Sequence, residues 1–238
     1  MKIALSGSSG RMGQLIIKVA NESGHEIVSR INRSTVYYDF VSTKPDVCID
    51  FSAPAGTVKL CSIAAECKIP ILVGTTGFTN EDLRTIEDFA KVIPILVSSN
   101  FSIGIHVLRK LVREAAQSLP KDFGIEIVEK HHTKKKDAPS GTALAILSDI
   151  KSIKNDSIEL FGRHGQSEYR SGEIGIHAIR GGDVVGEHDV YFFGQGERLE
   201  IAHQATNREI FARGALFIAE KFYKINTPKL YNLEEVMG

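Results

Sequence analysis

The chain has 238 residues, of which 42% are hydrophobic and 24% are charged, so it can bury a core as one large domain or two modest ones. Its 29 basic and 29 acidic residues balance, which leaves no overall field to recruit nucleic acid or a membrane surface. No stretch reaches the roughly 18 to 20 apolar residues of a membrane helix, and no signal peptide is visible. We therefore expect a soluble cytoplasmic protein that recognises a small ligand through local charge.

The first element is an apolar strand over residues 2–6, which a glycine turn joins to an amphipathic helix over residues 14–20. The turn has the spacing Gly-x-x-Gly-x-x-Gly, where the usual dinucleotide fingerprint is Gly-x-Gly-x-x-Gly. Glycines let the backbone approach a pyrophosphate, and the helix dipole favours its charge. The alternative is a turn without a ligand. We predict that this turn, which consists of Gly7, Ser8, Ser9, Gly10, Arg11, Met12 and Gly13, holds the pyrophosphate of a dinucleotide cofactor.

The second strand, over residues 24–31, is predicted to end beside the adenosine ribose of the cofactor. An Asp or Glu at this position ordinarily binds the 2′-hydroxyl of NAD. This sequence instead has Arg30, Asn32 and Arg33, and no acid before Asp39. Because arginine suits a 2′-phosphate, we predict that NADPH is used at least as well as NADH, with Asn32 and Arg33 in contact with it. The alternative is a pair of surface arginines that bind nothing.

Three further apolar strands are expected over residues 46–50, 70–73 and 93–97, with helices between them. This alternation predicts a Rossmann-type, doubly wound parallel sheet. Small polar residues follow two of these strands, where open α/β sheets bind ligands, although either segment could be a plain strand-to-helix turn. The predicted nicotinamide-side contacts are Gly74, Thr75, Thr76, Ser98, Ser99, Asn100 and Phe101.

The pattern changes after a helix over residues 103–117. Strands over 123–129, 173–180, 184–194 and 197–205 predict a mixed or antiparallel sheet in an α+β domain. We expect a dinucleotide-binding domain over residues 1–102 and a substrate-binding and oligomerisation domain over 103–206. A helix over residues 207–223 and the end of the chain to residue 238 should pack back on the first domain.

The most distinctive stretch, residues 129–142, combines two adjacent histidines, three consecutive lysines and a Ser-Gly-Thr turn that opens a helix. The N–H groups and hydroxyls at such a helix start can hold a carboxylate or phosphate. A lysine held beside them could donate a proton. A solvated basic loop followed by an ordinary helix cap is the alternative, but the combination favours a site for an acidic small molecule.

The three cysteines, Cys48, Cys61 and Cys67, lie in apolar patterns and form no Cys-x-x-Cys pair. They are predicted to be free thiols in a reducing compartment. The histidines and cysteines lack the spacing of metal ligands, so no metal site is expected.

Together, these motifs resemble those of the dihydrodipicolinate reductase (4-hydroxy-tetrahydrodipicolinate reductase) family, from the first strand to the last helix. The most specific of them is the block from the histidine pair to Ser140-Gly141-Thr142. The resemblance implies NAD(P)H-dependent reduction of a cyclic imine with two carboxylates in lysine and diaminopimelate synthesis, by a homotetramer. It also implies that His131 is the acid/base histidine, that Lys135 is the proton donor, and that the substrate is bound by His132, Ser140, Gly141 and Thr142.

Two features depart from the family pattern: Asn32 stands where members carry an acid, and the segment over residues 34–45 is shorter. Two other functions fit parts of the sequence. One is a related Rossmann oxidoreductase such as an aspartate dehydrogenase, which would share the glycine turn but gives no reason for the histidine and lysine block. The other is a non-catalytic module that senses NAD(P)H.

Overall fold

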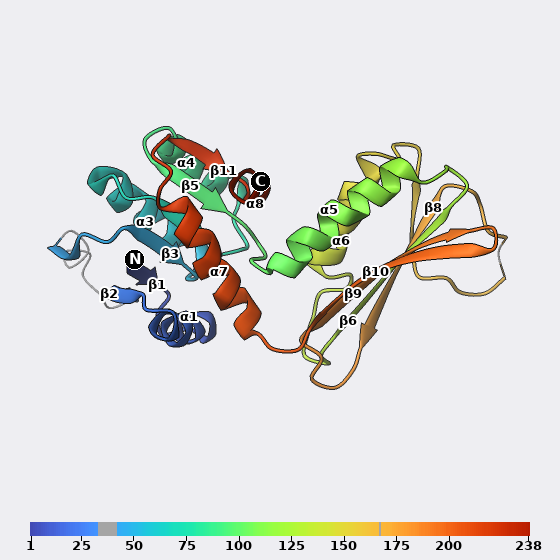
Figure 1. Ribbon diagram of the computed structural model, residues 1–238, viewed down its shortest axis with the longest axis horizontal. Coiled ribbons are helices and arrows are strands. Elements are labelled where there is room, and N and C mark those ends of the chain that lie inside the picture. The colour runs from blue at the N-terminus through green and yellow to red at the C-terminus, as the bar shows by residue number, and fades with distance from the viewer. Residues whose placement is uncertain (33–41, 167) are drawn as a thin grey trace. The chain divides into compact units, whose positions relative to one another are not determined.

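The computed structural model describes residues 1–32, 42–166 and 168–238. The chain divides into two compact units (Figure 1). Unit 1 comprises Met1–Ser102 and Glu209–Gly238, and unit 2 comprises Ile103–Arg208. None of the helices within the described ranges is long and apolar enough to span a bilayer.

Unit 1 contains a six-stranded sheet in which every pair of neighbouring strands is parallel. Its order is β11-β5-β4-β3-β1-β2. The strands are β1 (Lys2–Ser6), β2 (Glu26–Ile31), β3 (Val47–Asp50), β4 (Ile71–Val73), β5 (Pro94–Val97) and β11 (Lys229–Tyr231). The strand order reverses at β1, because β2 pairs with one side of it and β3 with the other. Such a reversal opens a crevice at the carboxyl ends of the strands.

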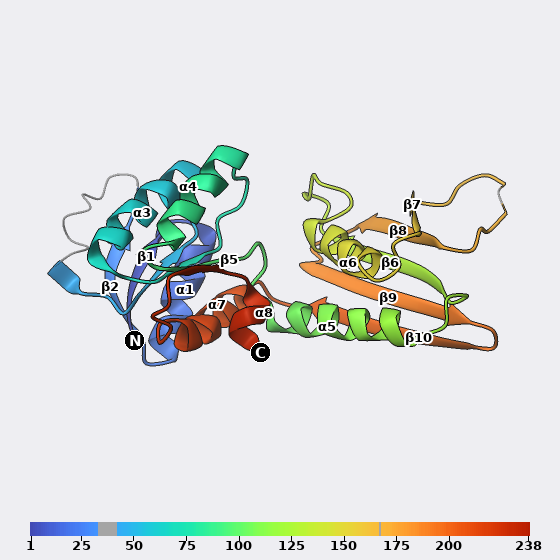
Figure 2. The ribbon, with the colours of Figure 1, turned by 90° about the horizontal axis from the view of Figure 1, so that it is seen from above.

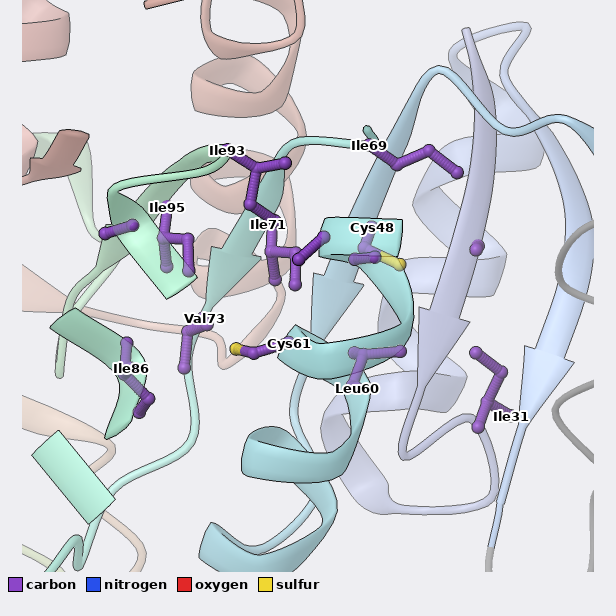
Figure 3. Close-up of a cluster of buried hydrophobic side chains, with 14 residues drawn as sticks. Ile31, Cys48, Leu60, Cys61, Ile69, Ile71, Val73, Ile86, Ile93 and Ile95 are labelled. Carbon is purple, nitrogen blue, oxygen red and sulfur yellow. The ribbon is translucent and has the colours of Figure 1, made fainter. Parts of the chain in front are cut away.

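Helices cover both faces of this sheet, as Figure 2 shows. They are α1 (Arg11–Glu22), α3 (Pro54–Cys67), α4 (Asn80–Ala90) and α7 (Glu209–Phe222), with the short α8 (Leu233–Met237) at the end of the chain. Helix α1 packs against α7, and α3 packs against α4. Cys48 and Ile71 of the sheet meet Leu60 and Cys61 of α3 in a core that excludes water (Figure 3). Burial on both faces explains why β3 and β4 are continuous apolar runs.

Unit 2 contains a mixed five-stranded sheet in the order β10-β9-β6-β8-β7. The strands are β6 (Gly124–His131), β7 (Ile158–Phe161), β8 (Glu173–Arg180), β9 (Gly186–Gly194) and β10 (Glu197–Ala205). Strand β6 pairs with β8 in parallel and with β9 antiparallel. Helices α5 (Ile103–Ser118) and α6 (Gly141–Lys151) pack together over one face, above the buried side chains of β6, β8 and β9.

The predicted fold class is confirmed: a parallel α/β sheet is joined to a mixed-sheet α+β region. Two strands were not predicted. Strand β11 adds a sixth strand to the first sheet by pairing with β5, and β7 adds an edge strand to the second. They are as short as β3 to β5, but none of their residues is buried and each contains a charged residue, so they do not stand out as continuous apolar runs.

Candidate active site

The segment from the glycine turn after β1 to the first turn of α1 requires glycine at two positions, Gly7 and Gly13. A Cβ atom added at Gly7, whose φ is +76°, would lie 2.2 Å from the Phe51 carbonyl oxygen. A Cβ atom at Gly13 would lie 2.3 Å from the Gly7 carbonyl oxygen. The backbone of the turn is therefore drawn tightly against the end of β3 and the first turn of α1.

The start of α1 suits an anion. Its N-cap is Gly10, which supplies no side-chain hydrogen bond, and the first turn carries no acidic residue. Backbone N–H groups at such a helix start bind phosphate oxygens. Ser9, Gly10 and Arg11 are exposed, whereas Ser8 is buried and its hydroxyl lies 3.4 Å from the Ile31 carbonyl oxygen that it donates to. The turn that includes Gly7 and Met12 thus fits the pyrophosphate of a dinucleotide.

A buried carboxylate organises the loops after β3 and β4. Asp50 is fully buried, and its oxygens accept hydrogen bonds from Ser52 Oγ at 2.6 Å, Thr57 Oγ1 at 2.5 Å and Thr75 Oγ1 at 2.6 Å. Thr75 Oγ1 also accepts from the Ser52 N–H at 2.9 Å. The predicted contact Thr75 therefore has its hydroxyl engaged within the protein, and it holds the loop that presents its exposed neighbour, Thr76.

The predicted nicotinamide-side residue Gly74 lies against the Phe51 ring, which in turn packs on the ring of Phe101. A Cβ atom at Gly74 would lie 2.3 Å from the Phe51 ring, so only glycine fits there. The Phe51 and Phe101 rings pack with centroids 5.8 Å apart, and Phe101 is buried. After β5, Ser98 Oγ donates to the Asn100 carbonyl oxygen at 2.8 Å and closes the turn, in which Ser99 is exposed.

At the end of β2, Asn32 is exposed, and Arg33 and Asp39 lie outside the described residues. Asn32 and the predicted cofactor contacts at 7–12, 74–76 and 98–101 each follow the carboxyl end of a parallel strand in unit 1. The fold therefore gathers these segments at one edge of the sheet, where α/β proteins bind nucleotides.

In unit 2, the alternation of β6 carries polar residues onto the face that α5 and α6 cover. Ile125, Ile127, Glu129 and His131 all point to this face and are all buried. Across β6, Arg180 of β8 lies opposite His131, and His188 of β9 lies opposite Glu129. The sheet register thus assembles a cluster of ionisable groups at the end of the apolar core.

Glu129 is the centre of this cluster. Its Oε2 lies 2.5 Å from His131 Nδ1 and 2.8 Å from Arg180 Nη1. Its Oε1 accepts from Arg180 Nη2 at 2.7 Å and from the Ser140 N–H at 2.9 Å. Burial opposes ionisation of this carboxyl, but the hydrogen bonds from Arg180, His131 and Ser140 outweigh it and lower its pKa. Glu129 is therefore a carboxylate at neutral pH.

Burial lowers the pKa of His131, and the charges of Lys135 and Arg180 act in the same direction against the opposing effect of Glu129. His188, whose ring packs edge-on to His131 with centroids 5.3 Å apart, is more strongly affected. Burial and the neighbouring His131 lower its pKa to about 4. Both imidazoles are thus neutral at physiological pH.

The second histidine of the pair lies in a different environment. His132 Nε2 is 2.9 Å from Arg208 Nη2, so it accepts a hydrogen bond from the guanidinium. His132 Nδ1 is buried, and among the described residues it has no partner.

Lys135 Nζ lies 2.8 Å from Asp137 Oδ2, and its side chain is half-buried, whereas Lys134 and Lys136 are exposed. Its backbone N–H donates to the His132 carbonyl oxygen at 3.1 Å. The charge of this ammonium also contributes to lowering the pKa of His131.

The start of α6 lies beside the Glu129 cluster. Ser140 caps the helix: its Oγ accepts from the Ala143 N–H and lies 3.1 Å from His188 Nε2. The Ser140 hydroxyl is therefore engaged within the protein. Gly141 and Thr142 form the first turn, Gly141 is exposed, and a Cβ atom added there would meet open space. This helix start can receive a carboxylate group.

The predictions assigned no function to four polar residues at these sites: Asp50, Arg180, His188 and Arg208. Arg180, His188 and Arg208 contact side chains that are at least 48 residues away in sequence, so no local spacing identifies these contacts. Asp50 contacts Ser52 and Thr57 nearby, but its bond from Thr75 spans 25 residues. Glu129 differs, because its alternation with Ile125, Ile127 and His131 indicates a carboxylate on the buried face of a strand.

Comparison with known proteins covers both units. The family model described as "Dihydrodipicolinate reductase, N-terminus" matches residues 1–101, and the one described as "Dihydrodipicolinate reductase, C-terminus" matches residues 104–237. A 4-hydroxy-tetrahydrodipicolinate reductase of Caldanaerobacter subterraneus is 44% identical, with 100% of this chain and 98% of the relative covered. One from Archaeoglobus fulgidus is 39% identical, with 100% of each covered.

A solved structure, the dipicolinate-bound dihydrodipicolinate reductase from Paenisporosarcina sp. TG-14, superimposes with a TM-score of 0.80 at 26% identity. The match covers 98% of this chain and 97% of that one. A probable dehydrogenase from Thermotoga maritima has a TM-score of 0.66 at 12% identity, which supports the fold alone. Both halves of the chain are thus matched along their length, and the chain belongs to the dihydrodipicolinate reductase family.

Proposed function

We propose that this chain, which is a 4-hydroxy-tetrahydrodipicolinate reductase of lysine and diaminopimelate synthesis, binds its cofactor through unit 1 and its substrate through unit 2, with Lys135 as the proton donor. The observation that carries these roles is the cluster of unit 2. A buried carboxylate contacts His131 and the start of α6, and Arg180 connects it to the segment that carries Lys135.

The substrate is a ring with two carboxylates, so it requires cations and hydrogen-bond donors. We assign this binding to His132 and to the first turn of α6, with Gly141 and Thr142 offering backbone donors at the positive end of the helix. Ser140 holds that turn in place through its contacts with Glu129 and His188. The dipicolinate in the Paenisporosarcina structure is itself a ring dicarboxylate, which supports a substrate of this class.

When bound, the reduced nicotinamide cofactor supplies the hydride. The glycine turn would hold its pyrophosphate, and the loops fixed by Asp50 and Phe51 would hold its nicotinamide end. We propose that both NADPH and NADH serve. The end of β2 presents Asn32 in place of an acid, so a 2′-phosphate would meet no like charge at that position.

Reduction of the conjugated imine leaves negative charge on the ring system, and a proton must then be added. Lys135 suits this step because its ammonium carries a transferable proton and lies in the loop between His131 and the start of α6. Positive charge at this position also stabilises the developing anion before the proton moves. The flanking Lys134 and Lys136 are exposed, which favours Lys135 among the three.

We further propose a homotetramer in the cytoplasm. The face of the unit 2 sheet opposite α5 and α6 carries Ile179 and Phe193, which are 48% and 41% exposed, next to Tyr191. Packing between two such faces would bury them. Cys48 and Cys61 are free thiols in the core, which fits a reducing compartment. Sedimentation equilibrium tests the assembly, and a monomer at micromolar concentration would contradict it.

The activity is tested by mixing the protein with NADPH and the heterocycle, made in place from pyruvate and aspartate semialdehyde. We expect the absorbance of the reduced nicotinamide to fall only when the heterocycle is present. A protein that binds NADPH without turnover would instead be a sensing module. One that oxidises NADPH with other imines but leaves the heterocycle unchanged would be a different Rossmann oxidoreductase.

A further inference from the structure

Glu129 contacts the proposed acid/base histidine, the cap of the proposed substrate-binding helix and a guanidinium that reaches the lysine loop. We propose that Glu129 is a positioning residue, which holds His131 in the tautomer with its hydrogen on Nδ1, so that His131 Nε2 acts as a hydrogen-bond acceptor. This inference rests on the proposed function and deepens it, because it makes His131 an acceptor in the reaction and leaves Lys135 as the proton source.

The tautomer follows from the number of donors around the carboxylate. An ionised carboxylate only accepts hydrogen bonds, at about four lone-pair sites. Glu129 receives Arg180 Nη1 and Nη2 at 2.8 and 2.7 Å and the Ser140 N–H at 2.9 Å, which leaves His131 Nδ1 at 2.5 Å as the fourth contact. A contact this short between a nitrogen and a carboxylate oxygen requires a hydrogen on the nitrogen.

The groups that face His131 from the surrounding elements determine its charge. They are Glu129 on its own strand, Arg180 on β8, His188 on β9 and Lys135 in the loop that follows. Two of these neighbours are cations, and together with burial they keep the imidazole neutral. A neutral imidazole with hydrogen on Nδ1 has none on Nε2. His131 Nε2 therefore cannot supply the proton in the resting enzyme.

Arg180 connects the Glu129 carboxylate to the loop between β6 and α6, which carries Lys135. Besides its two bonds to Glu129, its Nη2 donates to the Asp137 carbonyl oxygen at 2.6 Å. Asp137 in turn pairs with Lys135 Nζ at 2.8 Å. One buried carboxylate thus fixes the histidine, the segment that carries the lysine, and the start of α6 through Ser140. Its removal should disturb the reacting groups of unit 2 and leave cofactor binding by unit 1 unchanged.

Strand β6 also supplies a matched control three residues earlier, on its opposite face. Glu126 Oε2 lies 2.6 Å from His177 Nε2, and Glu126 Oε1 accepts from Arg163 Nη2 at 2.8 Å. This cluster has the same three residue types, a glutamate on β6 with a histidine and an arginine, although its histidine lies on β8 and that of the Glu129 cluster lies on β6. It contacts none of the residues that we place in the site. Glu126→Gln therefore removes a similar structural interaction without touching the contacts of Glu129. Because Glu126 lies opposite Tyr191, on the face that we propose packs between subunits, sedimentation equilibrium checks that the control variant assembles like the wild type.

The first test measures the wild-type protein and needs no folded variant at residue 129. Long-range ¹H–¹⁵N NMR spectra distinguish the two imidazole tautomers, and the His131 signals are identified by their loss in His131→Asn. At pH 7.5 we expect His131 to show hydrogen on Nδ1 and an unprotonated Nε2. Hydrogen on Nε2, or a fully protonated ring, would overturn the proposal. Because this readout needs no turnover, it stands apart from the assay of the proposed function.

The second test compares Glu129→Gln with Glu126→Gln. We expect the first to lower kcat about 100-fold or more, as expected for a mispositioned catalytic imidazole, with the KM for NADPH within about twofold of wild type. The acidic limb of its kcat profile should move to lower pH, because Glu129 raises the pKa of His131. Glu129→Asp, which keeps the charge, should recover part of the rate. Equal losses in the two glutamine variants, or an unshifted profile, would refute the positioning role.

Discussion

The Asp50 carboxylate offers a direct test of how unit 1 is held together beneath its proposed cofactor site. We predict that Asp50→Ala lowers the free energy of unfolding of unit 1 by about 4 kcal/mol, since a hydrogen bond to a charged group contributes about 1.5–3 kcal/mol. Asp50 accepts three such bonds, from Ser52, Thr57 and Thr75.

The predicted loss of about 4 kcal/mol depends on which of the three hydroxyl groups could find another acceptor once Asp50 is removed. Ser52 Oγ and Thr57 Oγ1 also lie 3.4 and 3.2 Å from the Ala53 carbonyl oxygen, so each hydroxyl can turn to a second acceptor. The Thr75 hydroxyl already accepts from the Ser52 N–H and depends on Asp50 as its own acceptor. The full loss of the Thr75 bond, about 3 kcal/mol, and partial losses at the other two give the total.

Hydrogen exchange of the β3 and β4 amides measures this change in unit 1 alone, and far-ultraviolet circular dichroism in urea provides a second probe. Asp88→Ala is the matched control, because its ion pair with Lys91 is exposed on α4 and should contribute less than about 1 kcal/mol. We also expect the KM for NADPH to rise in Asp50→Ala, since the loop that carries Thr75 and Thr76 is released. A loss below about 1 kcal/mol at Asp50 would refute this account of the carboxylate.

Three further predictions concern unit 2 and the cofactor. The pKa of His188 is about 4 in the folded protein and 6.5 as the ordinary value, so the unfolded chain binds more protons between these pH values. The stability that depends on neutral His188 is therefore complete above pH 6.5, and about 3 kcal/mol of the free energy of unfolding is lost as the pH falls toward 4. Urea unfolding of His188→Gln across this pH range should lack this loss. If the free energies of variant and wild type fall in parallel with pH, the prediction is contradicted. Lys135→Ala should lower kcat by about 10²–10⁴ with NADPH binding nearly unchanged, while Lys134→Ala and Lys136→Ala stay close to wild type; near-normal turnover of Lys135→Ala would exclude it as the proton donor. Asn32→Asp should shift the ratio of kcat/KM values toward NADH, because a carboxylate binds a ribose 2′-hydroxyl and repels a 2′-phosphate; an unchanged ratio would place the ribose elsewhere.

Much of the fold could be predicted because its signals are local. The parallel strands of unit 1 are buried on both faces, so they stand out as apolar runs between helices. The segment after β1 is recognisable from its glycines, because the backbone is so crowded at Gly7 and Gly13 that a side chain would clash there. The fold class followed from this alternation. The three-residue β11 carries no such period, and its pairing with β5 joins segments more than 130 residues apart.

The candidate site was predictable only where its residues are neighbours in sequence. His131, Lys135 and Ser140 share one stretch, so their chemistry could be read from it. Arg180 and His188 meet Glu129 only through the register of β8 and β9 against β6, which no spacing in the sequence specifies. The hydrogen bond from Thr75 to Asp50 likewise depends on the pairing of β3 with β4.

The central claim is that this chain moves a hydride from nicotinamide C4 to the dicarboxylate heterocycle. Its most direct test is the reaction with NADPH deuterated stereospecifically at C4, with the product analysed by mass spectrometry. One C4 epimer should deliver a single deuterium to the tetrahydrodipicolinate product, and the other should deliver none. NADPH oxidation without deuterium in the product, from either epimer, would contradict the account.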